Sequence, residues 1–228
     1  MFTPYDWQEG IGHRAQYIQA KLAQGSPVIA VSLEAGILVF TYRRQARKIY
    51  EIYDRLIFAG IGQQSDVEAL RVAALEFASK EGFNRSEEDV TIQRVATALS
   101  GPLKKAFSDF SSSPVVARSL FGEVNETPAE DLYYALDYDG DYTTSRNHAI
   151  IGGSTEESTI DVTKLSDLKE ATPEEAFEAL KSIWLTIADP SSEAVKEDLL
   201  KGLTAEAVLL ERSDARENRF RLLTPEEF

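Results

Sequence analysis

The sequence predicts an α+β fold built as a four-layer α-β-β-α sandwich, in which helices cover the outer faces of two stacked sheets. Residues 27–33 ("PVIAVSL") and 36–42 ("GILVFTY") are apolar on both faces, which indicates strands that are covered on both sides. Strand-like segments also come in two blocks with a pair of amphipathic helices between them, and a further helix follows the second block. Helices outside two stacked sheets are the simplest arrangement that covers such strands.

The composition indicates a single domain, residues 1–228, without disulfide bonds or thiolate metal sites. A chain of 228 residues can bury a large core, and it contains no cysteine. Its 38 acidic and 24 basic residues give a net charge of -14, which disfavours nucleic acid and anionic membranes as partners. The N-terminus does not resemble a signal peptide, and no apolar run approaches the roughly 18 residues of a membrane span. We therefore expect a cytoplasmic protein without a cofactor.

The first block of the chain predicts one helix followed by two strand pairs. In order, these are a helix at 8–24 that stops at Gly25, strands at 27–33 and 36–42, and strands at 48–50 and 56–61. Glu34-Ala35-Gly36 separates the first two strands as a hairpin turn.

Two long amphipathic helices are expected between the blocks of strands. Ser65 and Glu68 have the spacing of a capping box, and apolar residues then recur at helical intervals up to Gly82. The second helix should begin near Ser86, and Gly101-Pro102 should kink or interrupt it. The two helices should pack as an antiparallel pair.

The second block predicts three more strands, a last helix and a terminal hairpin. The strands are expected at 114–124, 131–138 and 148–154, with a turn at Asp139-Gly140, and the hairpin at 205–214 and 219–224. Thr172 and Glu175 form a capping box around Pro173 and so begin the last helix, and Ser154 with Glu157 offers another box.

The histidines and the clustered aspartates do not indicate a metal site. His13 and His148 lack paired carboxylates at metal-ligand spacing. Asp137, Asp139 and Asp141 alternate as metal ligands do, but the rest of a calcium loop is missing, so a turn is the better interpretation.

Several segments, taken together in their order and spacing, resemble a known family. They are "VIAVSLEAGILVF", "RKIYEIYDRLIFAGIG", "DLYYALDYDGDY", "AIIGGSTEES", "AVLLERSD" and "RFRLLT". They resemble 20S proteasome subunits, and more closely the α-type subunits of the bacterial, actinobacterial-like proteasome than the β-type. The resemblance implies the Ntn-hydrolase fold and a homo-heptameric outer ring that gates the entry of unfolded proteins. It also implies partner β-subunits, whose N-terminal threonine carries the chemistry.

The same resemblance implies roles for five residues of this chain. Lys48 stands where α-type subunits bind the C-terminal carboxylate of an activator, here a ring ATPase, in a pocket between neighbouring subunits. Gly62, fourteen residues later, lines that pocket, and Gln16 stands where many members carry a glutamate. Tyr5 and Asp6 are the gate candidates within residues 1–25, which comprise the gate segment and the first helix.

The arginines near Lys48 are open to three interpretations. Arg43, Arg44 and Arg47 could raise the local potential for a docking carboxylate, remain solvated, or pair with carboxylates of a neighbouring subunit. A fixed cation in a partly desolvated cleft attracts a chain-terminal carboxylate more strongly than one on an open surface. We therefore expect docking to depend on Lys48 first.

A self-processing peptidase in a one-component barrel is the main alternative. Ser26 follows Gly25 and stands where a β-subunit begins with its threonine, and Lys48 falls where such an enzyme carries its catalytic lysine. Tyr42, however, occupies the position of the required carboxylate, and Pro27 would constrain the free amine. A noncatalytic subunit is therefore favoured. A homo-oligomeric scaffold with the same fold is the third candidate.

Overall fold

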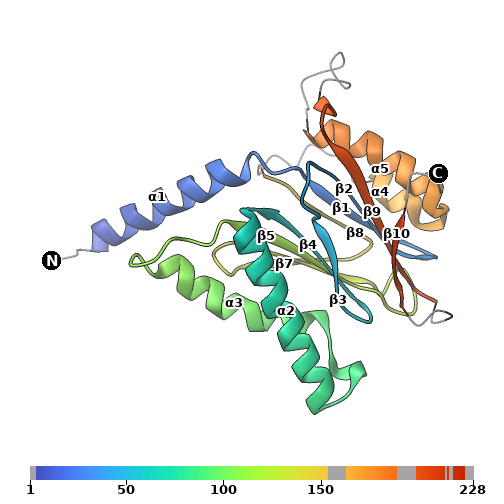
Figure 1. Ribbon diagram of the computed structural model, residues 1–228, viewed down its shortest axis with the longest axis horizontal. Coiled ribbons are helices and arrows are strands. Elements are labelled where there is room, and N and C mark those ends of the chain that lie inside the picture. Colours follow the sequence, from blue (N-terminus) through green and yellow to red (C-terminus); the bar gives the residue numbers. More distant parts are fainter. Residues whose placement is uncertain (1–3, 154–162, 189–198, 214, 216–217, 224–228) are drawn as a thin grey trace.

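The computed structural model describes residues 4–153, 163–188, 199–213, 215 and 218–223, and these form two five-stranded antiparallel sheets (Figure 1). The first sheet has the strand order β10-β9-β2-β1-β8 and the second the order β3-β4-β5-β6-β7. The first sheet comprises β1 (Val28–Leu33), β2 (Gly36–Arg43), β8 (His148–Ile151), β9 (Thr204–Glu211) and β10 (Phe220–Leu223). The second comprises β3 (Ile49–Tyr53), β4 (Leu56–Gly62), β5 (Ala117–Glu123), β6 (Leu132–Leu136) and β7 (Tyr142–Ser145).

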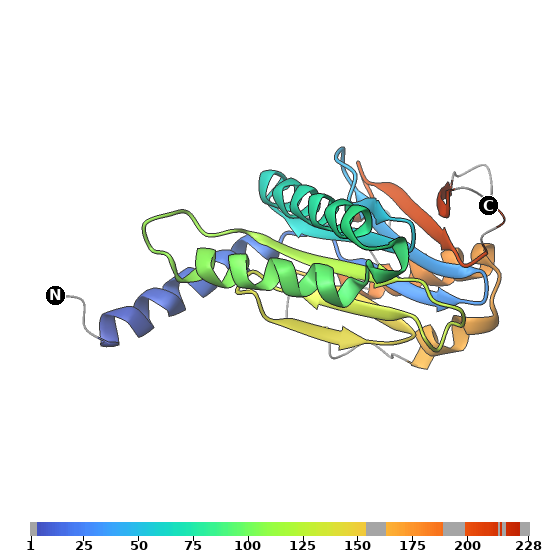
Figure 2. The ribbon, with the colours of Figure 1, turned by 90° about the horizontal axis from the view of Figure 1, so that it is seen from below.

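Helices lie on the outer faces of both sheets, which confirms the predicted four-layer sandwich (Figures 1 and 2). Helices α2 (Gln64–Asn84) and α3 (Ile92–Ser108) cover the second sheet, with the 3-10 turn η1 (Glu87–Asp89) between them. Helix α5 (Pro173–Ala188) covers the first sheet, together with α4 (Thr163–Ser166) and the 3-10 turn η3 (Asp167–Glu170).

The strands that are apolar on both faces contribute side chains to two different hydrophobic cores. Along β1, Val28 and Ala30 point into the layer between the sheets, whereas Ile29 and Val31 point toward α5. All six residues of β1 are buried, because both of its faces are covered. Burial of such strands between sheet and helix is what holds the layers together.

Helix α1 (Pro4–Leu22) begins four residues earlier than predicted and projects from one end of the sandwich (Figures 1 and 2). Proline fits the first position of a helix because its missing N–H has no intrahelical partner there. Ile18 and Leu22 anchor the C-terminal half in the core between the sheets, while Tyr5 in the first turn is 83% exposed. The helix is therefore buried where its C-terminal half meets the sandwich, and its first turn is exposed.

Two of the three predicted capping boxes fall on described residues, and these two have different outcomes. At α5 the box forms: the Thr172 backbone N donates to Glu175 Oε2 at 2.9 Å, and the Glu175 N donates to Thr172 Oγ1 at 3.3 Å. The box at Ser65 was wrong, because α2 starts at Gln64 and already includes Ser65. The neighbouring Asp66 carboxylate instead accepts a hydrogen bond from the Val116 backbone N at 2.7 Å, which ties α2 to the start of β5.

The helix pair differs from the prediction at two further points. Helix α3 starts at Ile92 rather than near Ser86, since residues 87–89 form η1. It also runs without interruption through Gly101-Pro102, because Leu99 and Leu103 are buried on either side and hold the same stripe against the sheet.

Strand β7 was not predicted, since all four of its residues are exposed and only its pairing with β6 marks it as a strand. The proposed box of Ser154 and Glu157 lies outside the described residues. Among the described helices, none is long and apolar enough to cross a membrane.

Candidate functional site

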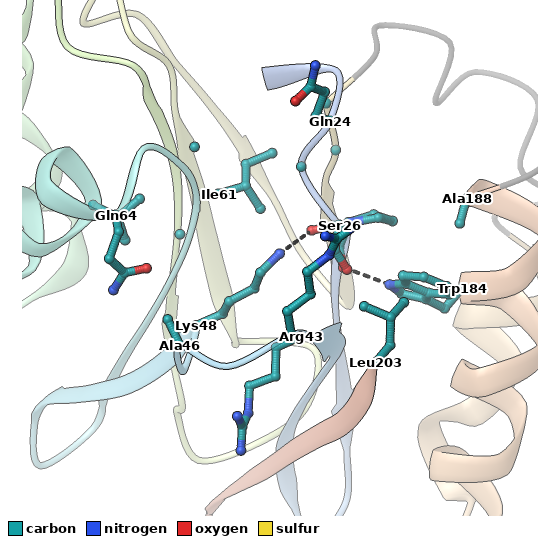
Figure 3. Close-up of a pocket in the computed structure, with 18 of the residues that line it drawn as sticks. Gln24, Ser26, Arg43, Ala46, Lys48, Ile61, Gln64, Trp184, Ala188 and Leu203 are labelled. Carbon is teal, nitrogen blue, oxygen red and sulfur yellow. Dashed lines mark hydrogen bonds between the residues drawn. The ribbon is translucent and has the colours of Figure 1, made fainter. Parts of the chain in front are cut away.

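A cavity of about 660 Å³ opens at one end of the sandwich, where loops from both sheets meet the end of α5 (Figure 3). Its walls come from the segment after α1 (residues 23–27), the loop between β2 and β3 (43–48), and the end of β4 (60–62). The opposite wall is apolar and consists of Trp184, Ile187 and Ala188 of α5 with Leu199 and Leu203. The cavity thus has a basic side and an apolar side.

Lys48, the last residue before β3, reaches across the cavity from its basic side (Figure 3). Its Nζ donates a hydrogen bond to the Ser26 backbone oxygen at 2.9 Å. Burial lowers the pKa of the Lys48 ammonium to about 8, and the nearby Glu206 carboxylate opposes part of this shift. Lys48 is therefore a partly buried amine whose hydrogen-bond partner is a neutral carbonyl.

Gly62 is brought to the same cavity by the β3–β4 hairpin. The register of the hairpin pairs Ile49 with Ala59, and the Gly60 backbone N donates to the Lys48 oxygen at 3.1 Å. Two residues beyond this point the strand returns Gly62 to the cavity wall, so the fourteen-residue spacing follows from hairpin geometry. Gly62 has φ of +123°, and a Cβ there would lie 2.2 Å from the Val116 oxygen, so only glycine fits.

Glu206 of β9 pairs with two of the arginines, and it was not predicted as a site residue. Its side chain is buried and accepts hydrogen bonds from the backbone N of Lys48 at 3.0 Å and of Ile49 at 3.3 Å. Arg43 Nε and Arg47 Nε lie 3.3 and 3.8 Å from its two carboxylate oxygens. Two of the arginines thus anchor the β2–β3 loop to Glu206 within this chain.

Arg44 lies on the same loop, is exposed, and lines the cavity. Among the contacts of the described residues, none is an ion pair of Arg44. The loop carries four basic side chains and the cavity side holds one buried carboxylate, Glu206, so the basic side of the cavity keeps a net positive charge.

Ser26 lies in the cavity wall, but Lys48 does not contact its hydroxyl. The Ser26 Oγ donates to the Tyr42 backbone oxygen at 2.5 Å, and Lys48 binds the Ser26 carbonyl instead. The Tyr42 ring lies on the other face of the sheet, against the Trp184 ring with their centroids 4.7 Å apart. Glu206, the carboxylate whose charge acts on Lys48, is engaged by backbone N–H groups and arginines rather than by Ser26.

The other three predicted site residues lie away from this cavity. Gln16 is exposed on α1, and Tyr5 and Asp6 are exposed in the first turn of that helix. The structure therefore brings together Lys48, Gly62 and Ser26 but not Gln16, whose predicted pocket lies between subunits.

Two of the aspartates at the β6–β7 turn have partners in the fold, one on β5 for Asp137 and one within the turn for Asp139. Asp137 accepts from Arg118 Nη2 at 2.8 Å, and Asp139 accepts from the Asp141 backbone N at 3.0 Å. Within the described residues no group of three or more acidic, histidine or cysteine side chains is placed to hold a metal ion.

Comparison with known proteins agrees with this architecture. The family model described as "Proteasome subunit" matches residues 23–196. The "Proteasome subunit alpha" of Jonesia denitrificans is 33% identical over 218 residues, which covers 94% of this chain and 90% of the relative. The protein of the same name from Streptomyces avermitilis is 26% identical over 232 residues and 89% of its length. That of Xylanimonas cellulosilytica is 34% identical over 146 residues, and this match spans only 59% of the relative.

The chain belongs to the proteasome subunit family, and the relatives that it matches bear the name of α-type subunits. The predicted Ntn-hydrolase sandwich of that family is confirmed by the two stacked sheets and their covering helices.

Proposed function

We propose that this chain is a noncatalytic α-type subunit of a bacterial 20S proteasome, which forms the outer ring and docks the C-termini of a ring ATPase. Neighbouring copies, most simply seven, would make the ring, and β-subunits stacked on it would carry the peptidase sites. The proposal places the particle in the cytoplasm, with unfolded proteins as its substrates.

The observation that carries the docking proposal is the cavity that holds Lys48 and Gly62 together. A peptide carboxylate entering it meets the Lys48 amine at one end, and the loop arginines keep that end positive. Gly62 presents no side chain, so the backbone of an incoming peptide can approach the wall closely. The apolar wall around Trp184 and Leu203 supplies surface for the residues that precede the carboxylate.

The gate at Tyr5 and Asp6 and the pocket residue Gln16 are proposed on the resemblance to α-type subunits. Tyr5 and Asp6 lie on the exposed first turn of α1, where a neighbouring copy can reach them. Gln16 lies on the same helix, so we assign it to the pocket of an adjacent subunit rather than to the cavity of its own chain.

Substitution of Lys48 tests the docking proposal directly. The probe is a fluorescent ten-residue C-terminal peptide of a bacterial proteasomal ring ATPase, and its binding is followed by fluorescence anisotropy. Loss of a partly buried ionic partner costs about 2 kcal/mol or more, so Lys48→Ala should weaken binding by at least about thirtyfold. The same peptide with an amidated C-terminus should bind the unaltered chain equally weakly.

The matched control is Lys105→Ala, which removes a lysine from the exposed surface of α3 and should leave binding unchanged. Electron microscopy of both variants would establish that rings still form. Equal peptide affinity of Lys48→Ala and Lys105→Ala would refute docking at Lys48.

We also propose that this subunit has no peptidase active site of its own, and the arrangement at Ser26 supports this. An N-terminal nucleophile needs an amine or lysine aimed at its hydroxyl, but here Lys48 binds the carbonyl and Ser26 Oγ is used within the fold. Intact-mass measurement of the purified chain separates the two cases, since self-processing would remove residues 1–25.

A further inference from the structure

The Lys48 amine differs from an ordinary surface lysine in what surrounds it. Its hydrogen-bond partner among the described residues is the neutral Ser26 carbonyl, at 2.9 Å. Glu206, the carboxylate whose charge acts on Lys48, is engaged by the backbone N of Lys48 and Ile49 and by two arginines. A lysine without a direct carboxylate partner loses less electrostatic stabilisation when it gives up its proton, so its pKa is more easily lowered.

The cavity around this amine favours small anions. It has a volume of about 660 Å³, which is ample for a phosphate-sized group beside Lys48. Arg43, Arg44 and Arg47 all line the cavity. A bound anion would therefore be held by guanidinium groups, and the Lys48 amine would stay free to react.

We propose that Lys48 is a site of acylation by anionic acyl donors, and that acyl phosphates are the class that the cavity fits. The Lys48 nitrogen attacks the carbonyl carbon of the donor, a C–N bond forms, and the C–O bond to phosphate breaks. The phosphate leaves with the electron pair of that bond, and the nitrogen releases one proton. The product is a neutral amide at Lys48 and free phosphate, so no oxidant or further reactant is needed.

Burial gives this amine the protonation state that acylation requires. The pKa of Lys48 is lowered to about 8, so about half of the amine is unprotonated at pH 8. A lysine with the ordinary pKa of about 10.4 is unprotonated to only about 0.4% at that pH. The charged groups near Lys48 are Glu206, which opposes the shift, and the arginines of its own loop.

Acylation would also regulate the proposed docking, and this consequence rests on the proposed function. An amide carries no charge, so the cavity would lose the cation that a peptide carboxylate needs. The chemical reactivity of Lys48 does not depend on docking, and the two can be measured separately.

The test exposes the purified full-length chain to acetyl phosphate and measures the initial acetylation rate of each lysine by quantitative mass spectrometry. At pH 8, Lys48 should be acetylated at least about tenfold faster than Lys105. Lowering the pH to 6.5 should slow Lys48 by about 16-fold but Lys105 by about 30-fold, because only Lys48 begins this range half unprotonated, so the ratio should rise about twofold. p-Nitrophenyl acetate, a neutral donor, is applied in parallel. Arg44→Gln should lower the rate at Lys48 with acetyl phosphate at least twofold relative to the rate with the neutral donor.

Lys48 modified no faster than Lys105 by either donor would overturn the proposal. If Arg44→Gln leaves the ratio of the Lys48 acetylation rates with the two donors unchanged, the proposed selectivity of the site for anionic donors would be overturned. Peptide binding by the same samples separates this proposal from the docking proposal. Acetylated chain that has lost binding supports both, acetylation of a chain that never bound peptide removes docking alone, and binding without acetylation removes the acylation site alone.

Discussion

Replacing Glu206 with glutamine removes the buried charge that anchors the β2–β3 loop beside Lys48. The carboxylate is only 4% exposed and accepts two backbone hydrogen bonds, from Lys48 N and Ile49 N. Glutamine keeps the shape but offers one acceptor oxygen, so one N–H would face the amide NH₂ group instead. Arg43 and Arg47 would also lose their ionic partner.

The magnitude follows from these contacts. A hydrogen bond to a charged acceptor contributes about 1.5–3 kcal/mol, and an unsatisfied buried N–H costs about 1–3 kcal/mol. The arginine side chains are 26% and 43% exposed, so solvent screens the two ion pairs and they add little. We therefore expect Glu206→Gln to lower the free energy of unfolding by about 3 kcal/mol, measured by urea denaturation at fixed protein concentration.

The control for this prediction is Glu34→Gln. Glu34 is 62% exposed and lies 3.8 Å from Lys169 Nζ, so its loss should change the free energy of unfolding by less than about 1 kcal/mol. A change of less than 1 kcal/mol in Glu206→Gln as well would mean that the carboxylate does not anchor the loop.

Two further predictions concern the same cavity. The pKa of Lys48 is about 8 in the folded chain and near 10.4 in the unfolded chain. Between these pH values the unfolded state binds more protons than the folded state. The free energy of unfolding, relative to that of Lys48→Met, should therefore rise with pH. Paired urea titrations should show this difference growing by about 1 kcal/mol between pH 8 and 9, and a flat difference would contradict the lowered pKa. Gly62→Ala should lower the melting temperature, at a cost of at least about 2 kcal/mol, because its Cβ would meet the Val116 oxygen at φ of +123°. Gly12→Ala, in open space on α1, should instead stabilise by about 0.5 kcal/mol, and equal effects would refute the steric argument.

The layers of the fold could be predicted because their signal is local. Strands such as β1 are apolar on both faces, and the box at Thr172 and Glu175 marks the start of α5 within four residues. Strand β7 carries no such signal, since its exposed residues become a strand only through pairing with β6. The box at Ser65 failed because α2 begins one residue before Ser65, and the neighbouring Asp66 holds the start of β5 through a contact that sequence spacing does not reveal.

The candidate site was predictable only in part. Lys48 and Gly62 were assigned through the resemblance, and their spacing makes physical sense because one hairpin lies between them. Glu206 is 158 residues from Lys48, and nothing in the local pattern near Lys48 points to it. A glutamate inside the apolar strand "AEAVLLE" was the available signal, since a buried carboxylate must find donors.

The arginines near Lys48 contribute to the site indirectly. A buried carboxylate beside a lysine would ordinarily bind the ammonium and so use the charge that an incoming carboxylate needs. Here Arg43 and Arg47, with two backbone N–H groups, occupy the oxygens of Glu206, and Lys48 is left with the Ser26 carbonyl as its hydrogen-bond partner. An ammonium has three donors, so an amine that gives one to a carbonyl keeps two for a ligand in the cavity. The pairing of arginine with Glu206 therefore explains both how an acidic chain stabilises this loop and why its lysine remains available to anions and electrophiles.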